Sequence, residues 1–264
     1  MNYLYLSFMD IIKAEFEKLK MQKFVPVFLS IFMAAGLLAT LGIVYFNERY
    51  GKISHPAETF AWWHSVLFQI IFTLCFVFVG TSHFCREFEK GMIKNIILTG
   101  ISLPQYLFSR LMTFFGVLSA ILLVTYTIDT ALMLLYYGAQ FDITVVGRGF
   151  FLTLLQLLQT LFLILLFSSL LKKTTTAIFL LLLYYMALEK IMVKLLISMT
   201  SYLNLSQWST FILRHTPLQV LDNMETAVGG DYMINLAVFV LYLAIYGIII
   251  WVGSRETELA LVEK

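Results

Sequence analysis

Residues 150–171 read FFLTLLQLLQTLFLILLFSSLL, a stretch that contains no charged side chain. As a helix it is about 33 Å long, which matches the hydrocarbon thickness of a bilayer. Similar runs recur along the 264-residue chain, in which 60% of residues are hydrophobic and only 13% are charged. Soluble proteins average about 25% charged residues. The sequence therefore predicts an all-α, polytopic membrane protein.

Six segments are long and apolar enough to cross a bilayer. We predict a single transmembrane domain over residues 1–264, with spans at approximately 24–46, 62–84, 111–137, 150–171, 174–196 and 232–253. The fifth span is the least regular, because its second half contains Glu189, Lys190 and Lys194. Twelve of the 18 Lys and Arg residues lie in segments 1–23, 85–110, 172–173 and 254–264. The positive-inside rule then places both termini in the cytoplasm, which fits an even number of crossings.

Residues 1–23 predict an amphipathic helix on the cytoplasmic surface of the membrane. Their apolar side chains recur at helical spacing, at Phe8, Ile12, Phe16 and Leu19. Charged side chains occupy much of the remaining surface, a pattern typical of a helix that lies flat in the interface. The alternative, an extension of the first span, is disfavoured because Lys20 and Lys23 interrupt the apolar run.

Residues 86–104, REFEKGMIKNIILTGISLP, form the most informative loop, between the second and third spans. Read as one helix, the loop has an apolar face and a charged face. The apolar face is Phe88, Met92, Ile93, Ile96 and Ile97, and the charged face is Glu87, Lys90 and Lys94. Gly100 is placed to end this helix, and Ser102 and Pro104 to begin the next. The pattern predicts a short helix parallel to the membrane, for which an ordinary interfacial connector is an equally good physical explanation.

This loop resembles the cytoplasmic loop of type-2 permeases of ATP-binding-cassette (ABC) transporters. Such loops commonly contain a Glu, a Gly-Thr-x-Lys-like core, an aliphatic run and an Ile-Ser-Arg-like turn. The matching residues are Glu87 or Glu89, Gly91, Lys94, Ile96, Ile97, Leu98, Gly100, Ile101 and Ser102. Met92 stands where Thr is usual, and Leu103 where a basic residue is frequent. The N-terminal helix, the six spans and the Pro217-containing segment before the last span also fit in outline.

The resemblance implies a permease subunit in a bacterial cytoplasmic (inner) membrane, paired with a second copy or a related permease. Its loop would be a cytoplasmic coupling helix that docks on a separate ABC ATPase, which would bind ATP and Mg. The N-terminal helix would share that contact. The implied coupling residues are Glu87, Glu89, Lys90, Gly91, Met92, Lys94 and Ile96, with Glu15 and Lys18 as neighbours.

The sequence carries no recognisable catalytic motif of its own. Gly51-Lys52 lacks the earlier glycine of a phosphate-binding loop, so we expect nucleotide hydrolysis only in a partner. No HExxH or GxSxG motif occurs, and the four histidines are scattered at His55, His64, His83 and His215. We expect no catalytic residue, no metal and no cofactor bound by this chain. Without a long basic run, nucleic acid is not an expected partner, whereas membrane lipids are.

Polar residues inside two spans leave two interpretations open. Asp129 is an acidic residue well inside the third span, where an unpaired carboxylate costs several kcal/mol. It either lines a cavity or gate towards the outer half, or bonds to Thr or Tyr neighbours or headgroup water, with Arg148 or Lys190 as a candidate partner. Gln156 and Gln159 in the fourth span either line a pathway or form interhelical hydrogen bonds.

Three functional hypotheses follow. The leading one is the permease half of an ABC exporter for an amphipathic or lipid-like compound, such as an antimicrobial peptide, because the span faces carry few fixed charges. The alternative is a subunit that transmits ATPase motion to an envelope, sensing or motility complex without transporting a solute. An ATP-independent carrier would have no ATPase partner. Residues 198–231 predict short helices at the outer leaflet, where similar permeases have a re-entrant or lid-like element.

Overall fold

The computed structural model describes the chain except for residues 1–7, 22–23, 51–54, 72–76, 139–140, 186–190, 192–193, 196–214, 227–229 and 263–264. The described residues form helices and turns and contain no strand. The chain divides into two compact units, namely Met1–Phe72 with Gln105–Leu158, and Thr73–Pro104 with Gln159–Lys264. Two long helices, α6 (Leu103–Tyr137) and α7 (Ile143–Leu171), contribute to both units.

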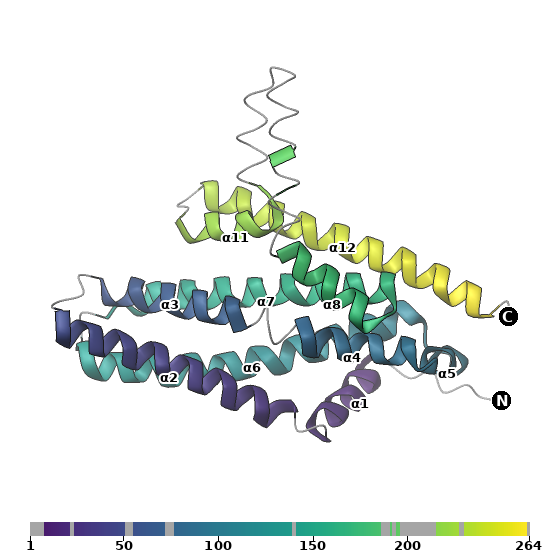
Figure 1. Cartoon of the computed structure of the whole chain (residues 1–264), viewed down its shortest axis with the longest axis horizontal. Coiled ribbons are helices and arrows are strands. Elements are labelled where there is room, and N and C mark those ends of the chain that lie inside the picture. Colours follow the sequence, from purple (N-terminus) through teal and green to yellow (C-terminus); the bar gives the residue numbers. More distant parts are fainter. Residues whose placement is uncertain are drawn as a thin grey trace, which may run out of the picture. The chain divides into compact units, whose positions relative to one another are not determined.

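Unit 1 contains α1 (Phe8–Met21), α2 (Phe24–Tyr50), α3 (Pro56–Ile71), most of α6 and the first half of α7. In Figure 1, α2 lies alongside α3 and α6. The core of unit 1 contains fully buried aromatic rings at Phe32, Phe60 and Phe114.

Asp142 caps the start of α7. Its Oδ1 accepts hydrogen bonds from the hydroxyl of Thr144 at 2.7 Å and from the backbone N–H of Thr144 at 2.8 Å. These bonds favour the ionised carboxylate and lower the pKa of Asp142. The beginning of α7 is therefore set by a local side-chain cap.

Unit 2 contains α4 (Val77–Glu89), α5 (Met92–Leu98), the rest of α7, α8 (Thr174–Leu183), α11 (Pro217–Thr226) and α12 (Gly230–Val262). α4 packs against α8, and α11 against α12. The hydroxyl of Tyr242 on α12 donates to the carbonyl of His215, just before α11, at 2.8 Å. α11 confirms a short helix within the predicted outer segment, of which residues 198–214 lie outside the described part.

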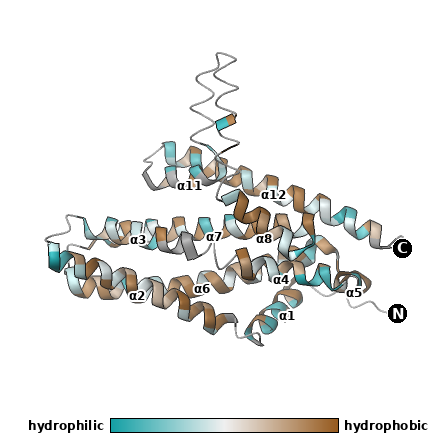
Figure 2. Cartoon of the chain, viewed as in Figure 1, coloured by the Kyte–Doolittle hydropathy of each residue, from teal (hydrophilic) through white to brown (hydrophobic). Residues whose placement is uncertain are grey.

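Four of the described helices are long and apolar enough to cross a membrane: Val25–Tyr50, Leu103–Tyr137, Ile143–Leu171 and Asp231–Ala260. They coincide with the first, third, fourth and sixth predicted spans and are largely apolar in Figure 2. The second predicted span covers α3 and α4 and includes undescribed residues 72–76. The fifth begins with the shorter apolar α8 and continues into undescribed residues, including Glu189 and Lys190. The count of six therefore remains a prediction.

The four long helices differ in how much of their apolar surface the chain itself covers. The most apolar stretches of α2 and α12 are less buried than those of α6 and α7. On α12, side chains such as Ile248 and Trp251 are exposed. α2 and α12 therefore leave more of their apolar surface uncovered by the rest of the chain than α6 and α7 do.

Candidate functional site

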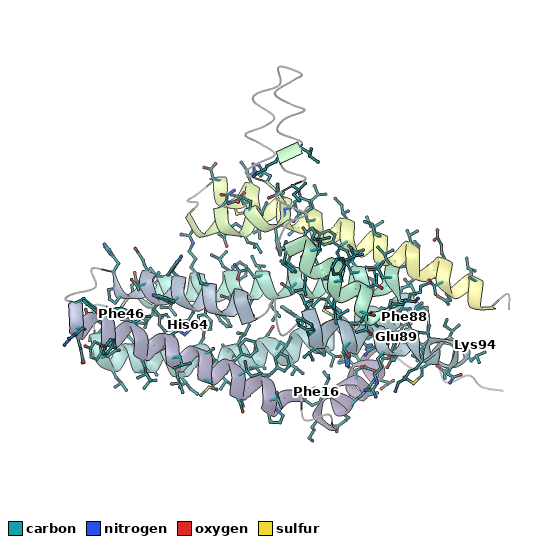
Figure 3. The ribbon with its side chains drawn as sticks, in the orientation of Figure 1. Phe16, Phe46, His64, Phe88, Glu89 and Lys94 are labelled. Carbon is teal, nitrogen blue, oxygen red and sulfur yellow. The ribbon has the colours of Figure 1, made fainter. Side chains whose placement is uncertain are left out.

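The coupling segment, which we define as residues 86–104, turns sharply at Gly91. Gly91 has φ 68°, a left-handed conformation that favours glycine because it has no Cβ. The backbone N–H groups of Lys90 and Gly91 donate to the last turn of α4. The single helix expected from the sequence is therefore two helices, with Phe88 on α4 rather than on the apolar face of α5. Figure 3 labels Phe88 and Lys94 on the two sides of this corner.

α5 buries one face and exposes the other. Ile93 is buried, and Ile96 and Ile97 are half-buried, as predicted for the apolar face, whereas Met92, which was assigned to the same face, is exposed. The exposed side chains are Met92, Lys94, Asn95 and Leu98, of which Leu98 is 70% exposed. α5 thus presents a small surface that combines apolar and charged groups, a mixture suited to contact with another protein.

Two glutamates proposed for the ATPase contact have different surroundings. Glu87 is only 5% exposed, so the expectation that it shares a solvated face with Lys90 and Lys94 is wrong. The exposed Glu89 accepts a hydrogen bond on Oε1 from the backbone N–H of Thr174, the first residue of α8, at 2.7 Å. A carboxylate is favourable at a helix N-terminus because it meets unpaired N–H groups and the positive end of the helix dipole. Glu89 therefore ties the end of α4 to α8.

The far end of the coupling segment is held by α12. The backbone N–H of Leu103, the first residue of α6, donates to Glu258 Oε2 at 3.3 Å. This bond satisfies one of the N–H groups that a helix start leaves without an intrahelical partner. Glu258 lies beyond the predicted sixth span, on the helical continuation of α12. This role of Glu258 is not predictable from the sequence, because no local pattern links residues so far apart in the chain.

A buried ion pair holds α1 to α6. Glu15 Oε2 lies 3.2 Å from Arg110 Nε, and the Tyr106 hydroxyl donates to Glu15 Oε1 at 3.3 Å. Lys18 Nζ also lies 3.4 Å from Glu15 Oε1. Glu15 is 6% exposed and Arg110 is 1% exposed. The Glu15 carboxylate is therefore engaged within the chain, whereas Lys18 remains partly accessible.

The remaining surface of α1 has an uncovered apolar face. Ile11 and Leu19 are buried together with Glu15, while Phe8 and Phe16 are exposed. Figure 3 labels Phe16 on this helix. The predicted single stripe that joined Leu19 to the two phenylalanines is therefore divided between two faces. Exposed aromatic side chains on an amphipathic helix are typical of contact with a membrane interface.

Asp129 meets a partner that the sequence analysis did not assign, His64 of α3. His64 Nε2 lies 3.0 Å from Asp129 Oδ2, and both side chains are 0% exposed. The expected partner Arg148 is wrong, because it is exposed on α7 and His64 occupies the contact; Lys190 lies outside the described residues. An ionisable residue inside the predicted second span was the signal available for His64.

The two glutamines of α7 also differ. Gln159 is buried, and its Nε2 donates to the carbonyl of Pro217, the first residue of α11, at 2.8 Å. Gln156 is half-buried. The contact of Gln159 agrees with the interhelical hydrogen bond that was one of its two interpretations.

The sequence matches a family model described as "ABC-2 family transporter protein" over residues 11–189, which is more than half of the chain. The matched range contains most of α1 and all of the coupling segment, α6 and α7. A search of curated proteins gives no match. The chain therefore belongs to the ABC-2 family of transporter proteins, as a multi-pass permease subunit of the ABC transporter class whose members work with an ABC ATPase.

Proposed function

We propose that this chain is the permease of an ABC exporter and forms a six-span pathway for an amphipathic or lipid-like substrate, an antimicrobial peptide being one candidate. The observation that carries the proposal is the shape of α5. This short helix lies between glycines with positive φ at Gly91 and Gly100, is anchored by buried Ile93, and exposes Met92 and Leu98. An exposed leucine on a fixed helix is a suitable anchor for a partner's pocket.

A separate ATPase, carrying ATP and Mg, docks on α5 in this proposal. Lys94 supplies a charge at the exposed face, and Met92 and Leu98 supply apolar area. The contact of Glu89 with α8 and that of Leu103 with Glu258 lie at the two ends of the segment. In this proposal, displacement of α5 is passed to α8 and α12 through these two hydrogen bonds.

α1 has a supporting role in this mechanism. The Glu15 carboxylate is used to attach α1 to α6, so we assign it to positioning rather than to direct contact with the ATPase. Lys90, which is exposed, can contact the ATPase directly, whereas the partly exposed Lys18 also contacts Glu15. The uncovered Phe8 and Phe16 lie in the lipid interface.

The proposed assembly contains two permeases in a bacterial inner membrane, with both termini of this chain in the cytoplasm. The distribution of Lys and Arg supports this orientation. The uncovered apolar faces of α2 and α12 supply surface for lipid and for the second permease. The scarcity of fixed charges on the spans favours an amphipathic substrate over a hydrophilic ion.

A mechanical role without solute transport is the second candidate. It is favoured by the complete burial of Asp129, which does not face an open pathway in this structure. Stimulation of the ATPase by candidate peptides or lipids separates the two functions. Stimulation supports export, whereas insensitivity to every candidate supports the mechanical role.

The docking surface is tested by three aspartate substitutions in the permease purified with its ATPase and reconstituted in liposomes. Leu98→Asp places a charge on the exposed face and should weaken ATPase binding by about tenfold or more. Ile96→Asp places it at the half-buried base of α5 and should uncouple hydrolysis from transport while membrane insertion remains intact. Leu259→Asp, at an exposed position on α12, is the matched control.

Co-purification measures binding, and substrate moved per ATP hydrolysed measures coupling. Wild-type transport by the Ile96→Asp variant contradicts the coupling model. Equal loss of ATPase binding in the Leu98 and Leu259 variants contradicts docking at α5.

A further inference from the structure

We infer that His64 and Asp129 form a closed site with no net charge, in which a single proton is shared between the two side chains. The hydrogen bond through this proton links α3 to α6 inside unit 1. The inference goes beyond the proposed function, because it concerns the protonation and stability of the helix bundle and does not require an ATPase. It assigns Asp129 to a structural proton site rather than to a substrate pathway.

The hydrogen-bond partners of the imidazole fix the number of protons. His64 Nδ1 lies 3.0 Å from the carbonyl oxygen of Phe60. A carbonyl only accepts, so Nδ1 carries a hydrogen. The 3.0 Å contact between Nε2 and Asp129 Oδ2 then needs one further proton, on the nitrogen or on the oxygen. The pair is imidazolium with carboxylate in the first case and imidazole with carboxylic acid in the second, and its net charge is zero in both.

Aromatic side chains enclose the imidazole. The ring of Phe60 lies 3.9 Å from that of His64, centroid to centroid, and the ring of Tyr126 lies 5.2 Å away. The ring of Phe141 in turn packs edge-on against Phe60. The Tyr126 hydroxyl bonds to Thr153 on α7 at 3.0 Å, which fixes this wall of the site. The enclosure explains why neither member of the pair is exposed.

α2 closes the site from another side through a glycine. A Cβ added to Gly36 would overlap Asp129 Oδ2 and would lie 2.9 Å from a methyl carbon of Thr125. The backbone of α2 therefore approaches the carboxylate so closely that position 36 has no room for a side chain. Little room remains for water beside Oδ2, which a carboxylate on an aqueous pathway would require.

The charged side chains that the structure describes on the surrounding helices are exposed or paired elsewhere. Glu48 and Arg49 on α2, Glu58 on α3 and Arg148 on α7 are exposed. On α6, the buried Arg110 pairs with Glu15. A net charge of either sign on the pair is costly inside an aromatic enclosure, which favours the neutral pair with one shared proton.

Two amide substitutions test the charge count. Asp129→Asn retains a donor, because the Asn amide N–H can bond to the lone pair of Nε2 while Nδ1 still bonds to Phe60. His64→Gln retains a side chain of similar reach, but it leaves the carboxylate buried without the proton that the imidazole supplied. The double variant, His64→Gln with Asp129→Asn, is again neutral. The three variants are purified as the full chain in detergent, and yield and apparent Tm are compared with the wild type.

We expect His64→Gln to lower the apparent Tm by on the order of 10 °C, and Asp129→Asn by only a few degrees. The double variant should recover most of the loss. If His64→Gln yields no folded protein, recovery of folded protein in the double variant gives the same support.

Two outcomes overturn the inference. A harmless His64→Gln means that the carboxylate reaches water, as a pathway residue would. A double variant no better than His64→Gln means that the site depends on its native side chains and not on net charge.

Discussion

α6 carries two buried ionisable pairs that differ in what fixes their charge. Arg110, near its beginning, meets Glu15 of α1, and Asp129, towards its end, meets His64 of α3. The two α6 residues are 19 positions apart, about 28 Å along the helix. Both pairs lie in unit 1. On one helix, therefore, two ionisable residues are buried, and each is stabilised by a different kind of partner.

The first pair keeps permanent opposite charges, and the second shares a proton. The guanidinium of Arg110 is a permanent cation that pairs with the Glu15 carboxylate, and Tyr106 and the partly exposed Lys18 supply additional donors. The pair at Asp129 is fully closed and consists of two groups that can exchange a proton. The comparison indicates that permanent charges occur where further polar partners are present, and a pair that can exchange a proton where aromatic rings form the surroundings.

The largest expected effect is the loss of Arg110. Arg110→Leu leaves the buried Glu15 carboxylate with only the partly exposed Lys18 as a cation, which should cost up to about 3–5 kcal/mol of unfolding free energy. Adding Glu15→Leu removes the stranded charge and should recover most of that stability. Arg148→Leu, at an exposed site on α7, is the control and should cost less than about 1 kcal/mol. Thermal unfolding in detergent measures all four proteins, and a double variant as unstable as Arg110→Leu alone contradicts the ion-pair account.

An intermediate loss of stability is expected when a side chain is added at Gly36, where α2 contacts Asp129. Gly36→Ala introduces a methyl group that overlaps Asp129 Oδ2, and it should cost about 1–3 kcal/mol. The cost should fall when the substitution is combined with Asp129→Ala, and a double-mutant cycle measures this coupling. Gly42→Ala is the matched control, because its Cβ meets nothing within 4 Å and alanine favours the helix. Equal destabilisation by the two alanines would argue against the close approach of α2.

The smallest effect on stability is expected at the corner of the coupling segment, outside both pairs. Gly91→Val forces a β-branched residue into a left-handed conformation, at a local cost of about 1–2 kcal/mol. Gly91→Asn adopts that conformation more readily and serves as the control. We expect Val, but not Asn, to reduce the substrate moved per ATP hydrolysed, with both buried pairs unaffected. The same loss in both variants would show that backbone conformation is not the cause.

Much of the helical architecture was predictable because it is a local property of the chain. The charge-free run at residues 150–171 requires a membrane-length helix wherever it is placed, and α7 contains it. Gly100, with φ 84°, ends the coupling helix as its position predicts, and α6 begins at Leu103, beside Pro104. Residues 72–76 and 186–190 leave the second and fifth spans as predictions.

The partners of the ionisable residues were not predictable because they depend on which helix faces meet. His64 and Asp129 are 65 positions apart, and no periodicity links them. Glu87 has the spacing of a solvated residue but is buried, since α4 ends at the Gly91 corner and its last turns are oriented independently of α5. Glu15 was assigned to an ATPase contact, but its carboxylate is engaged by Arg110.

The sequence by itself determined that this protein is helical, lies in a membrane and has a short two-faced helix in its principal loop, because hydrophobic length and periodicity act over neighbouring residues. Only the tertiary structure decided which charges are solvated, which are paired and which share a proton. The energy of a buried charge depends on atoms within a few ångströms, and here those atoms come from helices far apart in the chain.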